Sequence, residues 1–146
     1  MSIESAVEQG LKTAFKAYTD TLDPADAVTY RCFFLDDESD SALPTEQRKY
    51  PYIEITASPN WPTSHKFAFR DIPVSVTWAT QRQMDPKKST LVSLYENCRS
   101  IIDTESTIAV SGYSLIAVRI EAGGESDIEE NQQHIMLPLT VKICGA

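Results

Sequence analysis

The spacing of apolar residues near the start of the chain is typical of an amphipathic helix. Between residues 3 and 22, apolar side chains recur every three or four positions, which places them on one helical stripe. They are Ile3, Val7, Leu11, Ala14, Phe15, Tyr18 and Leu22. Ser2 is the expected N-cap. The helix is expected to end at Asp23-Pro24, because the residue before a proline avoids the helical region.

After this helix the period shortens from 3.6 to 2, which indicates β-strands. The pattern predicts strands over residues 28–34, 52–57, 67–80, 115–121 and 133–143. The inward positions are mostly aliphatic: Ile53 and Ile55; Ile72, Val74, Val76 and Trp78; Ile116, Val118 and Ile120; Ile135, Leu137, Leu139, Val141 and Ile143. Pro73 and Pro138 cannot donate to a ladder, and both suggest positions at sheet edges. For Pro73, a place near the strand start or a missing N–H that points away from a neighbour are the alternatives.

A second helix is predicted after the third strand. Asp85 is the expected N-cap, and Pro86 occupies the first helical position, where its missing N–H costs nothing. The buried stripe of this helix is Leu91, Leu94, Tyr95, Cys98, Ile101 and Ile102.

The resulting order is helix, three strands, helix, two strands. It predicts a single α+β domain over residues 1–146, with an antiparallel or mixed sheet of about five strands and two helices packed on one face. The connections 36–50 and 123–132 are longer than ordinary hairpin loops of about 2 to 5 residues, so we expect each to have a use or to be mobile.

Charge and composition narrow the function class. The 146 residues include 13 basic and 21 acidic side chains, for a formal net charge of −8. Clusters of Lys and Arg, which nucleic-acid binders need, are absent, since Arg48/Lys49 and Lys87/Lys88 are only dipeptides. No segment has the pattern of a signal peptide or a membrane span, so we expect a soluble cytoplasmic protein.

Motifs that carry chemistry are missing, and we predict no catalytic, cofactor-binding or metal-binding residues. The five glycines form no phosphate-binding loop, His65 and His134 stand alone, and no GxSxG occurs. Asp36, Glu38 and Asp40 have alternate spacing, but the Gly and Glu that a calcium loop requires are missing. Cys32, Cys98 and Cys144 are expected to be reduced, mostly packed thiols. Binding or assembly is therefore favoured over catalysis.

Trp61 lies in a turn-rich stretch, residues 58–66, which is incompatible with regular structure. Two alternatives stay open for it. Its side chain either folds back onto the core or is an exposed interface anchor for another subunit.

The acidic residues are unevenly distributed. Nine of the 21 lie in two segments without Lys or Arg: Asp36, Asp37, Glu38 and Asp40, and Glu121, Glu125, Asp127, Glu129 and Glu130. Without them the chain has 12 acidic and 13 basic side chains. The net charge is therefore a local feature of two acidic segments on a nearly neutral scaffold.

Most of the chain resembles the tail terminator, or tail completion, proteins of long-tailed bacteriophages. The resemblance lies in the helix before PYIEITA, in IPVSVTWATQ leading into DPKKSTLVSLYENCRSII, and in the closing hairpin LIAVRIEAGGESDIEENQQHIMLPLTVKI. It implies a non-enzymatic virion subunit that forms a ring, typically a hexamer, binds the end of the tail tube, stops its polymerisation and offers a surface to the head. It also implies assembly in the host cytoplasm.

A ring of this kind would let DNA pass without specific binding, and acidic side chains repel the phosphate backbone. Our hypothesis is that one or both acidic segments face the channel or the tube. The main alternative is a head–tail connector or neck adaptor. From other classes, a small acidic enzyme or a monomeric inhibitor stays open.

Overall fold

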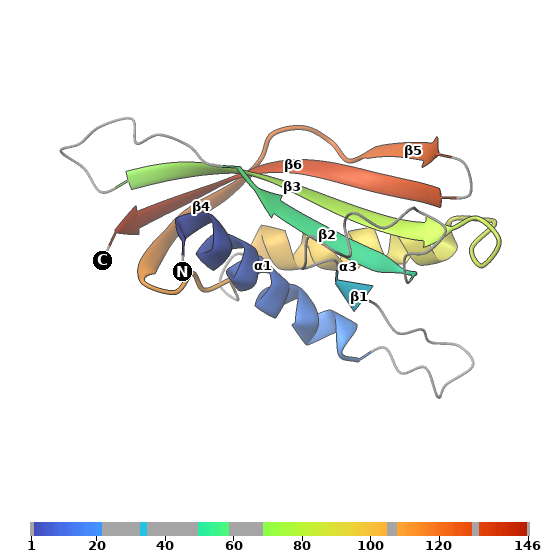
Figure 1. Ribbon diagram of the computed structural model, residues 1–146, viewed down its shortest axis with the longest axis horizontal. Coiled ribbons are helices and arrows are strands. Elements are labelled where there is room, and N and C mark those ends of the chain that lie inside the picture. Colours follow the sequence, from blue (N-terminus) through green and yellow to red (C-terminus); the bar gives the residue numbers. More distant parts are fainter. Residues whose placement is uncertain are drawn as a thin grey trace.

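The computed structural model describes residues 2–21, 33–34, 50–58, 69–104, 108–129 and 132–145, and of the strand residues 33, 125–127 and 129 it describes the backbone. Among the described residues, two helices lie against one face of a β-sheet and none lies on the other face (Figure 1). This arrangement confirms the predicted α+β class with both helices on one side.

Helix α1 spans Ile3–Thr19, and Ser2 is its N-cap as predicted, with its side-chain oxygen accepting from the Ser5 N–H at 3.1 Å. The helix ends three residues earlier than expected. The N–H and the hydroxyl of Thr21 both donate to the Tyr18 carbonyl, at 3.0 and 2.6 Å, which closes the last turn. The predicted end at residues 22–24 lies outside the described residues.

Within the residues that the structure describes, four long antiparallel strands make up the sheet, rather than the five predicted. They are β2 (Tyr52–Ala57), β3 (Phe69–Gln81), β4 (Tyr113–Ile120) and β6 (Gln132–Gly145), in the order β2-β3-β6-β4. Two short strands add to them: β1 (Phe33–Phe34) pairs parallel with β2, and β5 (Glu125–Glu129) pairs antiparallel with β6. The rest of the predicted strand 28–34 lies outside the described residues.

Strand β5 corrects the expectation of a long loop over residues 123–132. It pairs from Glu125 opposite Met136 to Glu129 opposite Gln132. The segment ESDIE has little intrinsic strand preference, and it becomes a strand because the first half of β6 offers it a pairing edge. Strands β4 and β5 both pair with β6, one after the other along the same side of it. Residues 121–124 separate the two paired stretches.

The expectation that Pro73 and Pro138 mark sheet edges is wrong, because both lie in the central strands. β3 and β6 pair over 13 residues, with Pro73 opposite Thr140 and Pro138 opposite Ser75. Each proline instead lies where the strand on its other side stops. The Pro73 carbonyl accepts from Ser58, just after β2, and the Pro138 carbonyl accepts from Glu121, just after β4. The missing N–H points the same way as the carbonyl, so no ladder bond is lost.

In β4 the predicted inward face was wrong at one position. The register shifts between Leu115 and Ala117, which makes Ile116 a bulged residue that is 48% exposed. Val118 and Ile120 are half-buried against the core as expected. Simple alternation does not reveal a bulge, because the extra residue is left unpaired by the register against β6.

Helix α3 spans Ser89–Thr104, so the prediction that it begins at Pro86 was wrong by three residues. The first intrahelical bond runs from the Val92 N–H to the Lys88 carbonyl, and Lys88 has a positive φ of 60°. Residues 82–88 therefore form a turn rather than helix. Asp85 still serves the helix, as described below.

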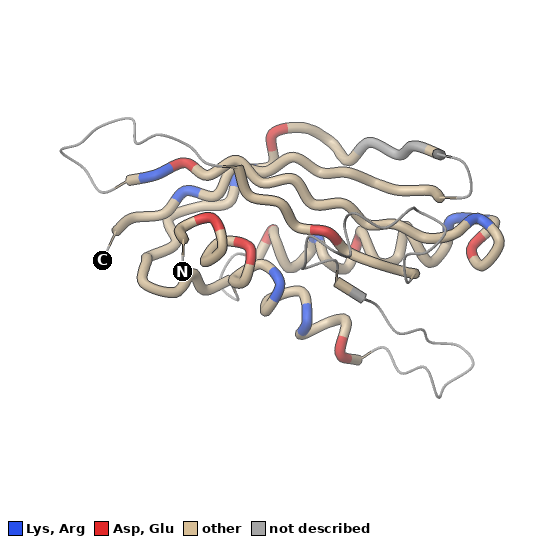
Figure 2. The backbone as a smooth tube through the Cα atoms, in the orientation of Figure 1, with Lys and Arg blue, Asp and Glu red and all other residues tan. Residues whose placement is uncertain are grey.

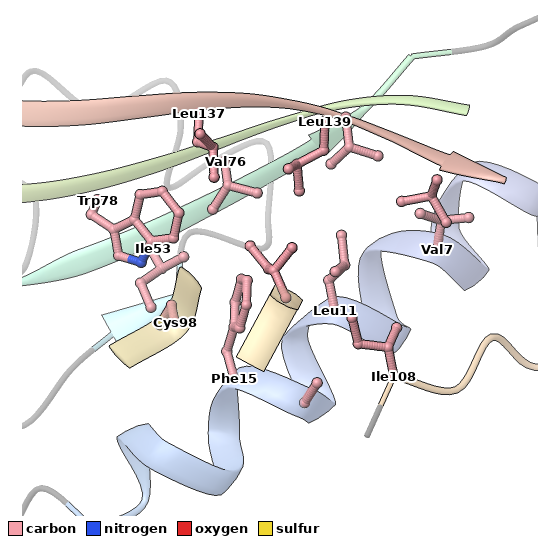
Figure 3. Close-up of a cluster of buried hydrophobic side chains, with 14 of the residues drawn as sticks. Val7, Leu11, Phe15, Ile53, Val76, Trp78, Cys98, Ile108, Leu137 and Leu139 are labelled. Carbon is pink, nitrogen blue, oxygen red and sulfur yellow. The ribbon is translucent and has the colours of Figure 1, made fainter. Parts of the chain in front are cut away.

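The core lies between the helices and the sheet, and it contains the predicted inward positions of α1, β3, β6 and α3 (Figure 3). Val7, Leu11 and Phe15 of α1 point toward the sheet, and the ring centres of Phe15 and Trp78 lie 6.2 Å apart. Gly10 lets α1 approach the segment before β4, since a Cβ there would meet the Ala109 carbonyl. No helix in the described ranges is long and apolar enough to cross a membrane.

Candidate functional site

Most of the predicted interaction residues fall where side chains are not described. Asp36, Asp37, Glu38, Asp40 and Glu130 of the acidic segments, and Trp61, the candidate interface anchor, lie outside the described residues. Glu125, Asp127 and Glu129 are placed by their backbone in β5. The structure therefore brings three acids of the second segment onto one short strand beside β6, and it leaves both alternatives for Trp61 open.

Glu121 is the one predicted acid whose side chain is described, and it is exposed next to a cation. The Arg119 Nε donates to the Glu121 Oε1 at 2.8 Å. A hydrogen bond from Thr140, and then the bond from Arg119, lower the pKa of the Glu121 carboxyl. The same pair raises the pKa of Arg119. The second acidic segment therefore begins with a carboxylate that a neighbouring guanidinium partly neutralises.

On the face of the sheet opposite the helices, here called the outer face, the two central strands form an uncharged strip. Three cross-strand pairs of β3 and β6 occupy it: Pro73 with Thr140, Ser75 with Pro138, and Thr77 with Met136. Met136 is 42% exposed. Beyond Asp71, β3 carries no charged residue up to Gln81 (Figure 2). Solvated outer faces of antiparallel sheets are normally polar, so this is a surface suited to contact with protein.

Charged residues flank this strip, because Arg119 of β4 pairs with Thr140 and Glu125 of β5 pairs with Met136. Asp71 lies directly opposite Lys142, whose Nζ lies 5.8 Å from the centre of the Phe69 ring. The Arg119–Glu121 pair is on the neighbouring strand. On β2, half-buried Glu54 borders the middle of the face opposite Thr77.

At the other end of the outer face, a small polar and aromatic cluster is buried. The hydroxyls of Tyr50 and Tyr52 donate to the Gln132 Oε1 at 2.7 and 3.0 Å, and their rings lie 5.3 Å apart. The Nδ1 atom of His134 is buried and has no hydrogen-bond partner among the described residues. The cluster holds the start of β6 against β2 and offers no reactive arrangement.

Asp85 is the centre of a buried polar network on the helix side. Its carboxylate accepts from the backbone N–H groups of Thr90 and Leu91 at 3.0 and 2.9 Å, and from the Thr80 hydroxyl at 3.2 Å. The Gln133 Nε2 donates to the Asp85 backbone carbonyl at 2.6 Å. Asp85 is only 3% exposed. It therefore caps α3 from outside the helix, and its negative charge is turned inward.

This inward carboxylate leaves a basic surface on the turn between β3 and α3. We call it the basic turn, defined by Arg82, Met84, Lys87 and Lys88. Arg82 and Lys87 are exposed, and Met84 is 49% exposed. The sequence alone showed Lys87 and Lys88 as a dipeptide beside an acid. What it did not show is that the acid points away from the surface.

A shallow depression between α1 and α3 has a volume of about 260 Å³ and is lined by Tyr18, Asn97, Ser100, Ile101 and Thr104. It contains no titratable group suited to acid–base chemistry at neutral pH. Within the part of the chain that the structure describes, no three His, Cys, Asp or Glu side chains gather as a metal site would require. No protein-family model and no curated protein that we compared matches the chain.

Proposed function

We propose that this chain is a structural subunit of a long-tailed phage: a tail terminator that assembles as a hexameric ring on the tail tube. In this role it stops tube polymerisation and offers the head, through its connector protein, a surface to join. The uncharged strip of β3 and β6 on the outer face of the sheet is the observation that supports an assembly role. The choice of tail terminator rests on the resemblance of the chain to that family.

The physical case for assembly is the combination of rigidity and surface composition. β3 and β6 pair over 13 residues, from Phe69 with Cys144 to Gln81 with Gln132, so the outer face is a rigid surface. Interface cores are depleted in charged residues and enriched in Met, as the middle of this face is. Rigid surfaces lose little conformational entropy on binding, which suits a subunit that must join several copies.

The acidic excess supports passage of DNA through the ring without binding. A chain of net charge −8 repels a polyanion, most strongly at the two segments that contain nine of its 21 acidic residues. In this proposal Asp36 to Asp40 face the channel, and the protein passes from the host cytoplasm into the virion at the junction of tail and head. Replacing these acids by Asn or Gln should alter tail assembly or DNA passage, and an unchanged phage yield would contradict the channel role.

The decisive experiment is loss of the chain in the phage that encodes it. Without a terminator, tail tubes should grow past their normal length, which electron microscopy of lysates measures directly. Loss of a connector or neck adaptor would instead give tails of normal length that fail to join heads. Tails of normal length, joined to heads, would overturn both assignments.

A further inference from the structure

We propose that strand β5 is a releasable cover on the edge of β6. In this proposal β5 separates from β6 while the rest of the sheet stays paired, and like charges on β5 favour its release. Four features of β5 support it: its sequence, the exposure of its one apolar residue, its connection to β4 and the spacing of its acids. The inference concerns a single chain, so it does not depend on the proposed function.

The sequence of β5 gives the strand little preference for its own conformation. Its five residues, ESDIE, comprise three acids, a serine and one isoleucine. Asp and, to a lesser degree, Glu are depleted in strands, where branched and aromatic side chains are favoured. By contrast, β3 and β6 pair over 13 residues and share core positions. The pairing of β5 therefore depends on the edge that β6 offers.

Burial also holds β5 weakly. Its one apolar residue, Ile128, pairs with Gln133 and is 45% exposed. Ile135, the inward residue of β6 that pairs with Ser126, is only 6% exposed. Hydrophobic stabilisation scales with the apolar area removed from water. The area that β5 itself buries is therefore small, whereas β6 is anchored by the core.

The connection from β4 allows β5 to separate without disturbing β4. Strand β4 keeps its own register against β6 up to Ile120, and the Glu121 N–H donates to the Pro138 carbonyl just after it. Residues 122–124 are exposed and lie between this bond and the first residue of β5. A Cβ on Gly123 would meet nothing within 4 Å, so the chain has room to move there.

The acids of β5 repel one another along the strand. Glu125, Asp127 and Glu129 occupy alternate positions, and therefore one face, at a spacing of about 7 Å. Like charges so close on a strand are destabilising. Arg82 offsets this repulsion at one end, because it follows Gln81, which pairs with the same residue of β6 as Glu129 does. Glu125 and Asp127 lie farther from that cation.

Release of β5 changes what the sheet offers to other chains. Residues 132–136 of β6 are then paired with β3 alone, and their outward N–H and C=O groups form an open edge. Open edges pair with extended segments of other chains, whereas a short, charged edge strand discourages such pairing. The paired and released states of β5 therefore close and open this edge.

Hydrogen exchange followed by mass spectrometry tests the release. After correction for intrinsic rates, the most protected amide of residues 125–129 should exchange at least about 100-fold faster than that of residues 74–78, because β5 opens without unfolding of the sheet. Residues 74–78 of β3 are the reference, since they pair with β2 and β6. Equal protection of the two segments would overturn the proposal.

A charge variant tests the cause. Glu125→Gln with Asp127→Asn removes the like charges that lie farthest from Arg82, and it should slow the exchange of β5 by about 5-fold. In the wild-type protein, 1 M salt should also slow this exchange, because the Debye length falls to about 3 Å. Unchanged exchange of β5 in the variant would overturn the proposal.

The matched control is Glu96→Gln with Asp103→Asn, which removes two exposed acids of α3 and changes the net charge equally. It should leave the exchange of β5 unchanged, and an equal slowing in both variants would overturn the role of the acids on β5. Protection of residues 74–78 should be the same in every variant, which shows that each is folded. The tail-length experiment is separate, because it uses the phage whereas exchange uses the isolated chain.

Discussion

Gly10 has no side chain, and this allows α1 to approach the segment before β4 closely. A Cβ at this position would meet the Ala109 carbonyl, a backbone group that moves only with its segment, and it would lie 3.5 Å from Val110. The glycine therefore sets the distance between α1 and the chain that leads into β4.

We expect Gly10→Ala to destabilise the protein by about 1–2 kcal/mol. Overpacking costs about 1–3 kcal/mol, and the better helix propensity of alanine returns up to about 1 kcal/mol. Urea unfolding followed by circular dichroism measures the difference. Gly123→Ala is the matched control, because a Cβ there meets nothing within 4 Å, and it should change stability by less than about 0.5 kcal/mol. Equal effects of both substitutions would contradict the close approach.

Cys98 is a second residue whose surroundings have a measurable consequence. It is fully buried in the core, as its place in the predicted stripe indicated. Burial raises the pKa of its thiol from 9.0 to about 12, and the nearby Trp78 indole acts weakly in the opposite direction. The thiol therefore stays protonated in the folded protein at pH values where it ionises in the unfolded chain.

This shift predicts a loss of stability in alkali. A group whose pKa is raised on folding stabilises the folded state fully below its unfolded pKa. That stabilisation is lost as the pH rises toward the folded pKa, here between 9 and about 12. Relative to Cys98→Val, the wild-type free energy of unfolding should fall with a slope approaching about 1.4 kcal/mol per pH unit. Denaturant unfolding from pH 8 to 10.5 measures this slope. Parallel curves for the two proteins would contradict it.

At the scale of elements, the start of α3 depends on one carboxylate outside the helix. Asp85 satisfies two backbone N–H groups of the first turn and binds Thr80 at the end of β3. Helix α3 and the sheet are therefore joined by a buried hydrogen-bond network as well as by the apolar core.

Asp85→Ala should destabilise the protein by about 2–4 kcal/mol, because it leaves two buried helix donors without their acceptor. Asp85→Asn keeps one acceptor oxygen and should have an intermediate effect. Thermal unfolding measures both. The control is Asp103→Ala, an exposed change near the other end of α3, which should stay within about 0.5 kcal/mol. A loss for Asp85→Ala no larger than the control would exclude the capping role.

The same elements show what periodicity can and cannot predict. The inward faces of β2, β3, β6 and both helices were predictable. Burial of one side of an element requires apolar residues at a regular spacing, and that spacing can be read from the sequence. The start of α3, the bulge at Ile116 and the strand β5 were not. Each depends on a partner distant in sequence: the buried Asp85 network, the register against β6, and the free edge of β6.

At the scale of the whole molecule, the positions of the charged residues affect its contacts more than the net charge does. The two acidic segments were visible in the composition, whereas the basic turn was not. Its positive surface depends on the direction of the Asp85 carboxylate, which only the folded chain defines. The basic turn begins after Gln81 and the acidic strand β5 ends at Glu129, and both of these residues pair with Gln132, so opposite charges meet at one corner of the sheet.

We expect self-association to strengthen as the salt concentration rises from about 0.01 M to about 0.1 M. Net repulsion between two acidic copies acts over about 30 Å at 0.01 M salt and is largely screened near 0.1 M, where the Debye length is about 10 Å. Sedimentation at a series of salt concentrations measures the change in mass. Self-association that weakens over this range would show that ion pairs between copies outweigh their net repulsion.

The interruption between β4 and β5 has a practical consequence. Four residues, 121–124, lie opposite only Leu137 and Pro138 of β6, so the length of this connection is not fixed by ladder bonds. Gly124 is closely packed against Tyr95, but Gly123 is surrounded by open space. A short peptide tag inserted between Ala122 and Gly123 should therefore leave the sheet intact. An antibody against that tag would mark the position of each subunit in electron micrographs of intact particles.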